Sequence, residues 1–222
     1  SEEPEIQQVP EGARTDRDVL SAVFMGLAVS PDNEVIYVAG GQENVVFRFD
    51  LATGEKIDSI ACSYRDDKVD FSHGYIGDLV LSQDGERLYA VDQINFRMCI
   101  IDTKVGRLLR SIPVGRYPFG ITLSKDEKEA YVANVGMYEY SWIPSYDPEN
   151  PVETSLDYPP FGYLSEESIE GIDNDSLQVP GLGDPNVPES FSVWTVDLEQ
   201  NQVTAKVKTG ILVGEVLDDI PA

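Results

Sequence analysis

The sequence predicts an all-β protein, a partial β-propeller of about three four-stranded blades, and three observations support this fold class. First, three segments are alike: LAVSPDNEVIYVA, LVLSQDGERLYAV and ITLSKDEKEAYVA, which begin at Leu27, Leu79 and Ile121. Second, short apolar strands separated by turn residues follow each copy, which is typical of all-β folds. Third, the serines of the three copies are 52 and 42 residues apart, close to the roughly 40–45 residues of a propeller blade.

The first blade begins with an expected strand over residues 23–29, where apolar residues alternate. The turn sequence SPDN follows, and its residue types favour a tight turn through local hydrogen bonds or a preset φ. We expect the remaining strands over 35–39, 44–50 and 56–61. Gly54 lies in the last connection, where it can adopt a positive φ.

The second and third blades repeat this order. Asp84-Gly85 is a strong hairpin signal, and an aspartate closes the third strand of each blade, at Asp50, Asp102 and Asp197. The last of these is displaced because a long segment is inserted before it. The expected blades cover about 22–62, 74–114 and 116–143 plus 190–209, with an insert over 144–189, in one partial propeller domain over 1–222.

Three blades are too few to close a ring, since single-chain propellers have typically 4–8. Residues 5–12 match residues 108–115, so the chain is expected to begin on a strand of a preceding blade. We therefore expect the remaining blades and a downstream domain of a longer parent chain, or sister subunits, as partners.

The segments YVAGG, YAVDQ and YVANVG, and the blade junction SIPVGRYPFGITLS, resemble the YVTN β-propeller repeat. The insert motifs ANVGMYEYSWIP, PPFGYLSEESIEGI and VPGLGDPNVPESFSVWTVD are similar to a bacterial subgroup in which such a propeller precedes an alkaline-phosphatase-like domain. This resemblance implies a parent protein exported to the periplasm or cell surface. It also implies that the metal-binding catalytic residues lie beyond Ala222.

Charge and composition exclude several classes of function. The chain has 16 basic and 40 acidic residues, a net charge of −24. Nucleic-acid binding needs clusters of Lys and Arg and is excluded, and no apolar run is long enough to span a membrane. We expect Cys62 and Cys99 to be buried, unpaired thiols, because a fourth strand and the next blade's third strand should not meet at disulfide distance.

The insert is rich in proline, aromatic and acidic residues. Loops of this length inside a domain are usually functional or disordered, and disordered segments are depleted in aromatics. We therefore expect an ordered excursion over one propeller face or against another domain. A short helix over 165–172 is expected, with Ser165 as its N-cap.

No catalytic residue is expected in this chain. His73 is the only histidine, so a zinc site with several histidines cannot be built. A Ser-His-Asp triad is disfavoured, because His73 is the only imidazole that could act as its base and the recurring serines are explained by the blade turns. No cofactor is expected with certainty. The three adjacent side chains of Asp173, Asn174 and Asp175 offer oxygen ligands for a structural Ca²⁺, but the EF-hand spacing is missing and a plain surface turn is the favoured interpretation.

A binding mouth is expected where the loops that enter each blade meet the loops between its second and third strands. This candidate set is mixed cationic, amide and aromatic: Arg65, His73, Asn95, Arg97, Arg116, Tyr117 and Asn134. Such a mouth suits an anionic small molecule or a peptide segment.

These observations favour a non-catalytic propeller segment that acts as a binding or docking scaffold, with the phosphatase-like domain of the same parent chain as its partner. One alternative is a propeller enzyme of the lactonase or quinone-dependent dehydrogenase type, with a site at the ring centre. Another is a structural surface-layer protein. Whether the parent is an enzyme is left open by the residues of this chain.

Overall fold

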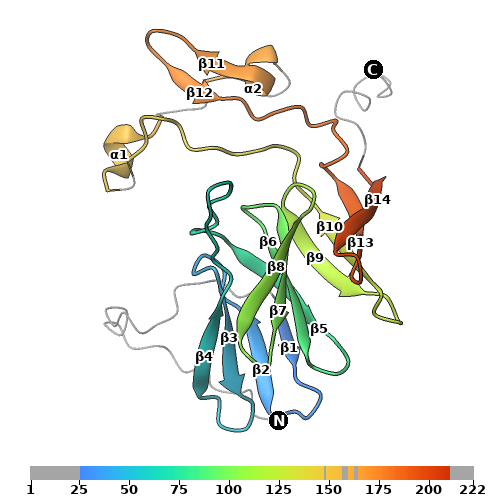
Figure 1. The fold of residues 1–222 in the computed structure, drawn as a ribbon. Helices are drawn as coiled ribbons and strands as arrows, with labels where there is room; N and C mark the ends of the chain where they lie inside the picture. The colour runs from blue at the N-terminus through green and yellow to red at the C-terminus, as the bar shows by residue number, and fades with distance from the viewer. Residues whose placement is uncertain (1–25, 148, 157–159, 163–164, 211–222) are drawn as a thin grey trace, which may run out of the picture.

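The structure is a computed structural model, and it describes residues 26–147, 149–156, 160–162 and 165–210. The blades are three four-stranded antiparallel sheets, as in a β-propeller (Figure 1). The all-β class and the partial propeller are thereby confirmed. The expected strand over residues 5–12, and the expected start of the first strand at 23, lie outside the described residues.

Within each blade, the strands neighbour one another in chain order. The first blade holds β1 (Leu27–Val29), β2 (Val35–Ala39), β3 (Val45–Asp50) and β4 (Lys56–Ala61). The second holds β5 (Ile76–Leu81), β6 (Arg87–Asp92), β7 (Arg97–Asp102) and β8 (Arg107–Pro113). The third holds β9 (Pro118–Leu123), β10 (Glu129–Asn134), β13 (Ser192–Asp197) and β14 (Gln202–Lys208).

The turn between the first two strands is built in the same way in all three blades. A serine hydroxyl donates to the aspartate two residues later, at 2.5, 2.7 and 2.7 Å for Ser30, Ser82 and Ser124. The same hydroxyl oxygen accepts the backbone N–H five residues on, at 2.9, 2.9 and 3.0 Å. The recurring serine is therefore a structural residue, because its hydroxyl closes the turn.

A second repeated turn follows the third strand of each blade. One carboxylate oxygen of Asp50, Asp102 or Asp197 accepts the backbone N–H groups two and three residues later, at 2.6–3.1 Å. This is the side-chain-to-backbone turn that aspartate favours. It explains why the same aspartate marks the end of the third strand in all three copies.

The core consists of two apolar layers, one at each junction between neighbouring blades. In β6, Leu88 and Ala90 belong to the layer shared with the first blade. Tyr89 and Val91 alternate with them and belong to the layer shared with the third blade. The second blade is thus buried on both faces, as period-2 alternation in a propeller requires.

Cys62 and Cys99 are both free and fully buried, in the layer between the first two blades. The expectation of unpaired, buried thiols is confirmed. A hydrogen bond with Cys99, together with burial, raises the pKa of the Cys62 thiol well above its ordinary value.

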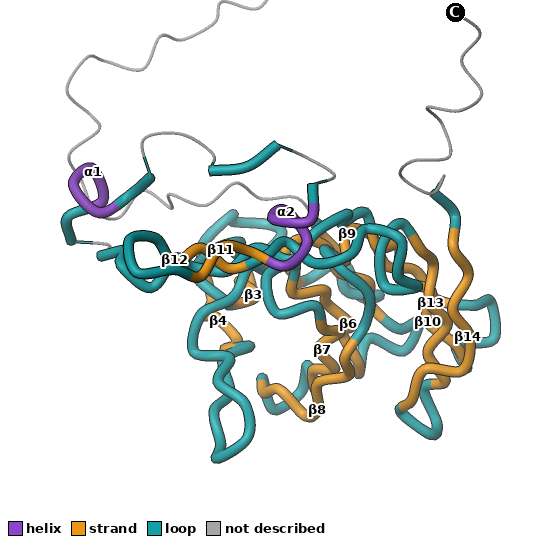
Figure 2. The backbone as a smooth tube through the Cα atoms, turned by 90° about the horizontal axis from the view of Figure 1, so that it is seen from above, coloured by secondary structure: helices purple, strands orange, loops and turns teal. Residues whose placement is uncertain are grey.

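The insert leaves the third blade after β10 and returns at β13. It contains α1 (Pro151–Thr154), α2 (Glu166–Glu170), β11 (Gly171–Asp173) and β12 (Gln178–Pro180). β11 and β12 pair as a hairpin, which lies with α2 beyond one end of the blades in Figure 1 and projects over that end in Figure 2. The N-cap expected at Ser165 is confirmed, since its hydroxyl accepts the Ser168 N–H at 3.1 Å. The helix is shorter than expected, because Gly171 at φ 93° ends it.

Candidate binding groove beside the second blade

The end of the blades from which the insert departs carries all seven residues of the expected binding mouth. They occupy the entry loops of the second and third blades and the corners between β6 and β7 and between β10 and β13. In the structure, however, some of these side chains form internal hydrogen bonds and ion pairs, and the others lie at the surface. This division decides what the end of the blades can bind.

Arg97 belongs to the fold. Its side chain is 1% exposed and pairs with the fully buried Asp92, with Nε donating to Oδ2 at 2.8 Å. Its two terminal nitrogens donate to the Ser111 hydroxyl at 2.9 Å and to the Cys62 carbonyl at 2.8 Å. One face of the guanidinium lies 4.2 Å from the centre of the Phe71 ring. Arg97 therefore ties the second blade to the loop that comes from the first.

Asn95 supports the same corner. Its side-chain nitrogen donates to the Asp92 carboxylate and to the His73 carbonyl, both at 2.7 Å. The backbone of His73 thus joins the corner, whereas its side chain is exposed. A short polar network therefore holds the loop before β5 against the turn between β6 and β7.

Arg116 anchors the insert. Its guanidinium pairs with Glu139 at 2.7 and 3.0 Å. It also donates to the carbonyls of Met137 at 2.9 Å and Asp184 at 2.7 Å. Because these residues lie near the two ends of the insert, one side chain fastens both ends to the third blade.

Asn134 is also part of the framework. It is 3% exposed, and its side-chain nitrogen approaches the Val132 and Ser192 carbonyls at 3.3 Å. Its side-chain oxygen has no hydrogen-bond partner among the described residues. The side chain faces Gly115, where a Cβ would lie 2.6 Å from the Asn134 Cγ.

Besides the exposed His73, two further members of the set lie at the surface or close to it. The Arg65 side chain is 73% exposed and pairs with Asp70 at 3.5 Å. Tyr117 is half-buried at φ 48°, between the rings of Phe96 and Tyr140, with centroids 5.3 and 5.8 Å away. Burial raises the pKa of the Tyr117 phenol.

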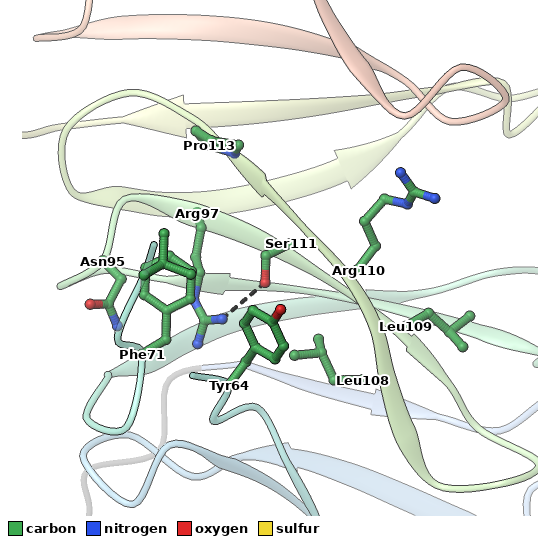
Figure 3. A pocket seen from close by; sticks show the side chains of 10 residues that line it. Tyr64, Phe71, Asn95, Arg97, Leu108, Leu109, Arg110, Ser111 and Pro113 are labelled. Atoms are coloured by element: carbon green, nitrogen blue, oxygen red, sulfur yellow. Dashed lines mark hydrogen bonds between the residues drawn. The ribbon is translucent and has the colours of Figure 1, made fainter. Parts of the chain in front are cut away.

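A groove of about 440 Å³ opens beside this end of the second blade. Figure 3 shows its lining side chains. They come from the loop before β5, the β6–β7 corner and the outermost strand β8: Tyr64, Val69, Phe71, Asn95, Arg97, Leu108, Leu109, Arg110, Ser111 and Pro113. Of the seven expected mouth residues, the groove therefore contains only Asn95 and Arg97.

The loop wall of the groove is a small hairpin. Tyr64 and Phe71 are joined by a backbone hydrogen bond of 2.7 Å, and Arg65 bridges Asp70 inside it. The Tyr64 hydroxyl donates to Asp66 at 2.6 Å, which fixes the outer part of the wall. The hairpin belongs to the loop before β5, which accounts for the ten extra positions between the first two serines relative to the last two. The longer spacing was thus the available sequence signal for this wall.

The opposite wall is the free edge of β8, since β8 is the last strand of its sheet. Four consecutive residues of this strand, 108 to 111, line the groove. Successive side chains of a strand point to opposite faces, so a cavity that touches all four runs along the edge of the strand.

The three residues considered for Ca²⁺ lie elsewhere, at the tip of the β11–β12 hairpin. Asn174 uses its side-chain oxygen to accept the Ser176 and Leu177 N–H groups at 2.9 Å. One oxygen of Asp173 accepts from Gln178 at 3.0 Å. The described residues contain no group of three or more His, Cys, Asp or Glu side chains that could hold a metal. Calcium binding by Asp173, Asn174 and Asp175 stays a prediction.

Within the described part of the chain, no helix is long and apolar enough to cross a membrane. No family model matches the sequence, and no curated protein matches it either.

Several solved structures are similar in fold. Kuenenia stuttgartiensis hydrazine synthase matches with a TM-score of 0.54 and 16% identity, over 92% of this chain and 40% of that one. The WD40 repeats of RRP9 match with a TM-score of 0.49 and 13% identity, over 84% and 39%. A Lactobacillus plantarum protein matches with a TM-score of 0.48 and 16% identity, over 84% and 42%. The chain thus spans about two fifths of the length of these structures, and at such identities the likeness concerns the fold alone.

Proposed function

We propose that this chain is a non-catalytic sector of a larger β-propeller and serves as a docking scaffold for another part of the same parent protein. The observation that carries the proposal is the division of groups at the end of the blades. Arg97, Arg116 and Asn134 are used up by internal hydrogen bonds. The groove beside them is open, largely apolar and aromatic. Such a surface suits recognition, because it offers contact area without an activated nucleophile or an acid–base pair.

The partner in this proposal is the alkaline-phosphatase-like domain suggested by the YVTN-type repeats and the insert motifs, in a bacterial protein exported to the periplasm or cell surface. Remaining blades of the parent chain, or sister subunits, complete the ring. The exposed outer faces of the terminal blades support this part of the proposal. Leu27 of the first blade is 62% exposed, and Val207 of the third, which pairs with Val193 on the face opposite Trp194, is 57% exposed, although both lie on strands of a packed sheet.

Photo-crosslinking in the full-length parent protein tests the proposal. A benzophenone amino acid replaces Leu109 in the groove in one variant and Leu51 in another. Both leucines are 41% exposed, and Leu51 lies in the turn between β3 and β4 and does not line the groove. We expect Leu109 to crosslink to peptides from outside residues 26–210 of the same parent, and Leu51 to give no such product. Equal yields from the two positions, or none from Leu109, would contradict docking at the groove.

A further inference from the structure

We propose that the groove binds an extended peptide segment as an added strand along the edge of β8, and that this segment carries an acidic residue next to an apolar one. This inference rests on the proposed docking function and names the chemistry of the docked element. It is argued from the free edge, the apolar wall and the charge of the groove.

The backbone of β8 leaves hydrogen-bonding groups unpaired at its outer edge. Val114 donates its N–H to Phe96 at 2.8 Å, and Ile112 pairs with Met98 two residues earlier. In an antiparallel ladder, alternate residues point their backbone groups toward the neighbouring strand. Ser111 directly precedes Ile112 and lies opposite Cys99 in the register, so its N–H and C=O have the opposite orientation and point outward.

The edge accepts only a short strand. Pro113 has no N–H to offer, so regular pairing ends there. At the other end, the register of β7 and β8 shifts between Ile100 and Ile101, which makes Leu109 the extra residue of a bulge. Bulges blunt exposed edges against long pairing. One full residue pair, opposite Ser111, is thus the centre of the site.

The residue opposite Ser111 faces an apolar slot. Directly opposed residues of an antiparallel pair place their side chains on the same face of the sheet. On that face, Figure 3 shows Ser111 beside Tyr64, with Leu108 next to the Tyr64 ring. The Phe71 ring, stacked on Arg97, closes the slot. An aromatic or branched aliphatic side chain of the bound segment fits here, in a cavity of about 440 Å³.

The next residue of the bound segment meets positive charge. Arg110 extends from β8 on the side away from Tyr64 (Figure 3), and among the described residues it has no ion-pair partner. The groove lining contains no carboxylate, in a chain with a net charge of −24. Its other arginine, Arg97, is paired with Asp92, so Arg110 supplies the positive charge of the groove. Two other hollows, at the β11–β12 hairpin, are lined by Asp173 and other acidic side chains. Charge complementarity therefore selects an acidic residue beside the apolar anchor.

Peptide binding to the 222-residue chain tests the inference. The probe is the acetylated and amidated hexapeptide Thr-Val-Phe-Asp-Val-Thr with a fluorescent label, measured by anisotropy. Three further peptides test the contributions separately. One has Lys in place of Asp and tests the charge, one has Ser in place of Phe and tests the apolar anchor, and one is N-methylated at the Phe amide and tests the backbone hydrogen bond. We expect saturable binding of the parent peptide and a loss of at least tenfold in affinity for each of the others.

Two protein variants complete the test. Arg110→Glu should weaken the Asp peptide at least tenfold and strengthen the Lys peptide. Arg107→Glu makes the same charge change on the same strand outside the groove lining and should alter affinity less than threefold. Far-UV circular dichroism establishes that both variants keep the β-sheet signal.

Binding that ignores the N-methyl group or the Arg110 charge reversal would overturn the added strand. Absence of saturable binding would do the same. If Leu109 still crosslinks to the parent protein in that case, the docking function stands and only the proposed form of its partner fails.

Discussion

The second and third blades close the corner between their second and third strands in opposite ways. In the second, Asp92 and Arg97 face each other across four intervening residues and form a buried ion pair. In the third, the equivalent positions are Asn134 and Ser192, separated by the whole insert, and the Asn134 side-chain oxygen has no hydrogen-bond partner in the described part of the chain. An ion pair closes the short corner of the second blade, whereas hydrogen bonds of the Asn134 amide close the long corner of the third blade. The long corner is held from outside by Arg116. Position in the repeat therefore fixes the backbone but leaves the chemistry of the corner free to differ.

The largest effect is expected from breaking the charged corner. Arg97→Leu leaves the Asp92 carboxylate buried without its cation, which typically costs about 3–5 kcal/mol. The melting temperature should fall by roughly 10 °C, measured by calorimetry. Arg87→Leu is the matched control, since Arg87 pairs with Asp102 in the same blade at 40% exposure. That pair should contribute less than about 1 kcal/mol. Equal losses in the two variants would show that burial of the corner pair is not decisive.

Glycines that face the two corners give the next largest effect. A Cβ on Gly74 would lie 2.6 Å from the Asn44 and Asp92 side-chain oxygens, and one on Gly115 would lie 2.6 Å from the Glu189 carbonyl. We expect Gly74→Ala and Gly115→Ala each to cost about 1–3 kcal/mol through overpacking, measured by urea unfolding. Gly120→Ala is the control, because its Cβ would meet nothing closer than 3.9 Å. A stability near that of the native chain for Gly74→Ala would mean that the side chains around the Asp92–Arg97 pair can move to accommodate the added methyl group.

Release of the insert should have a local effect. Arg116→Ala removes four hydrogen bonds that hold both ends of the insert. We expect cleavage within residues 137–190 by a dilute protease to accelerate about tenfold, which corresponds to about 1.4 kcal/mol of local opening. The melting temperature of the blades should change by only a few degrees. Arg65→Ala, at an exposed position, should leave the cleavage rate unchanged.

The carboxylates of the turn after the third strand should give the smallest effect per residue. The Thr53 N–H chiefly holds the pKa of Asp50 below its ordinary value, and the Val105 N–H does the same for Asp102. A lowered folded-state pKa contributes stability above the unfolded pKa, and this contribution is lost as the pH falls through the folded value. The urea midpoint should therefore decline below about pH 4.

Substitution of Asp50 measures how much of this acid sensitivity comes from a single turn. Asp50→Asn keeps an acceptor oxygen without the charge, so its midpoint should decline less steeply below pH 4 than that of the native chain. Asp67→Asn is the control, since Asp67 accepts none of these turn hydrogen bonds. A steeper decline for Asp50→Asn would contradict the proposed contribution of the turn.

The repeat made the blades predictable from the sequence. Ser30 and Asp50 recur because each closes a turn with its own backbone, and such local chemistry survives in the order of residues. The capping serine of α2 was predictable for the same reason. The β11–β12 hairpin was not predicted, because its pairing joins two three-residue strands with weak individual signals.

The candidate site was less predictable, since it depends on which face of a strand a residue occupies. Arg97 was placed at the mouth by its position in the corner, but it shares a face of β7 with Cys99 and Ile101 and so points into the blade junction. Tyr64 and Leu109 belong to no motif, and only the fold brings them together. The alternation of β7 contained the signal for Arg97. The longer first serine spacing indicated the loop wall of the groove, but no pattern in the sequence indicated that this wall meets the edge of β8.

The length of the insert also sets the order in which the blades can close. Joining Asp92 to Arg97 requires only a tight turn, whereas joining Asn134 to Ser192 closes a loop of about 57 residues. If the loops were fully flexible, the entropy of closure would differ by about 2 kcal/mol, from the logarithm of their length ratio. Contacts of such unequal sequence separation form at different stages of folding. The first two blades can therefore assemble as a folding unit, and β13 and β14 join it afterwards, once the insert has been gathered at its two ends.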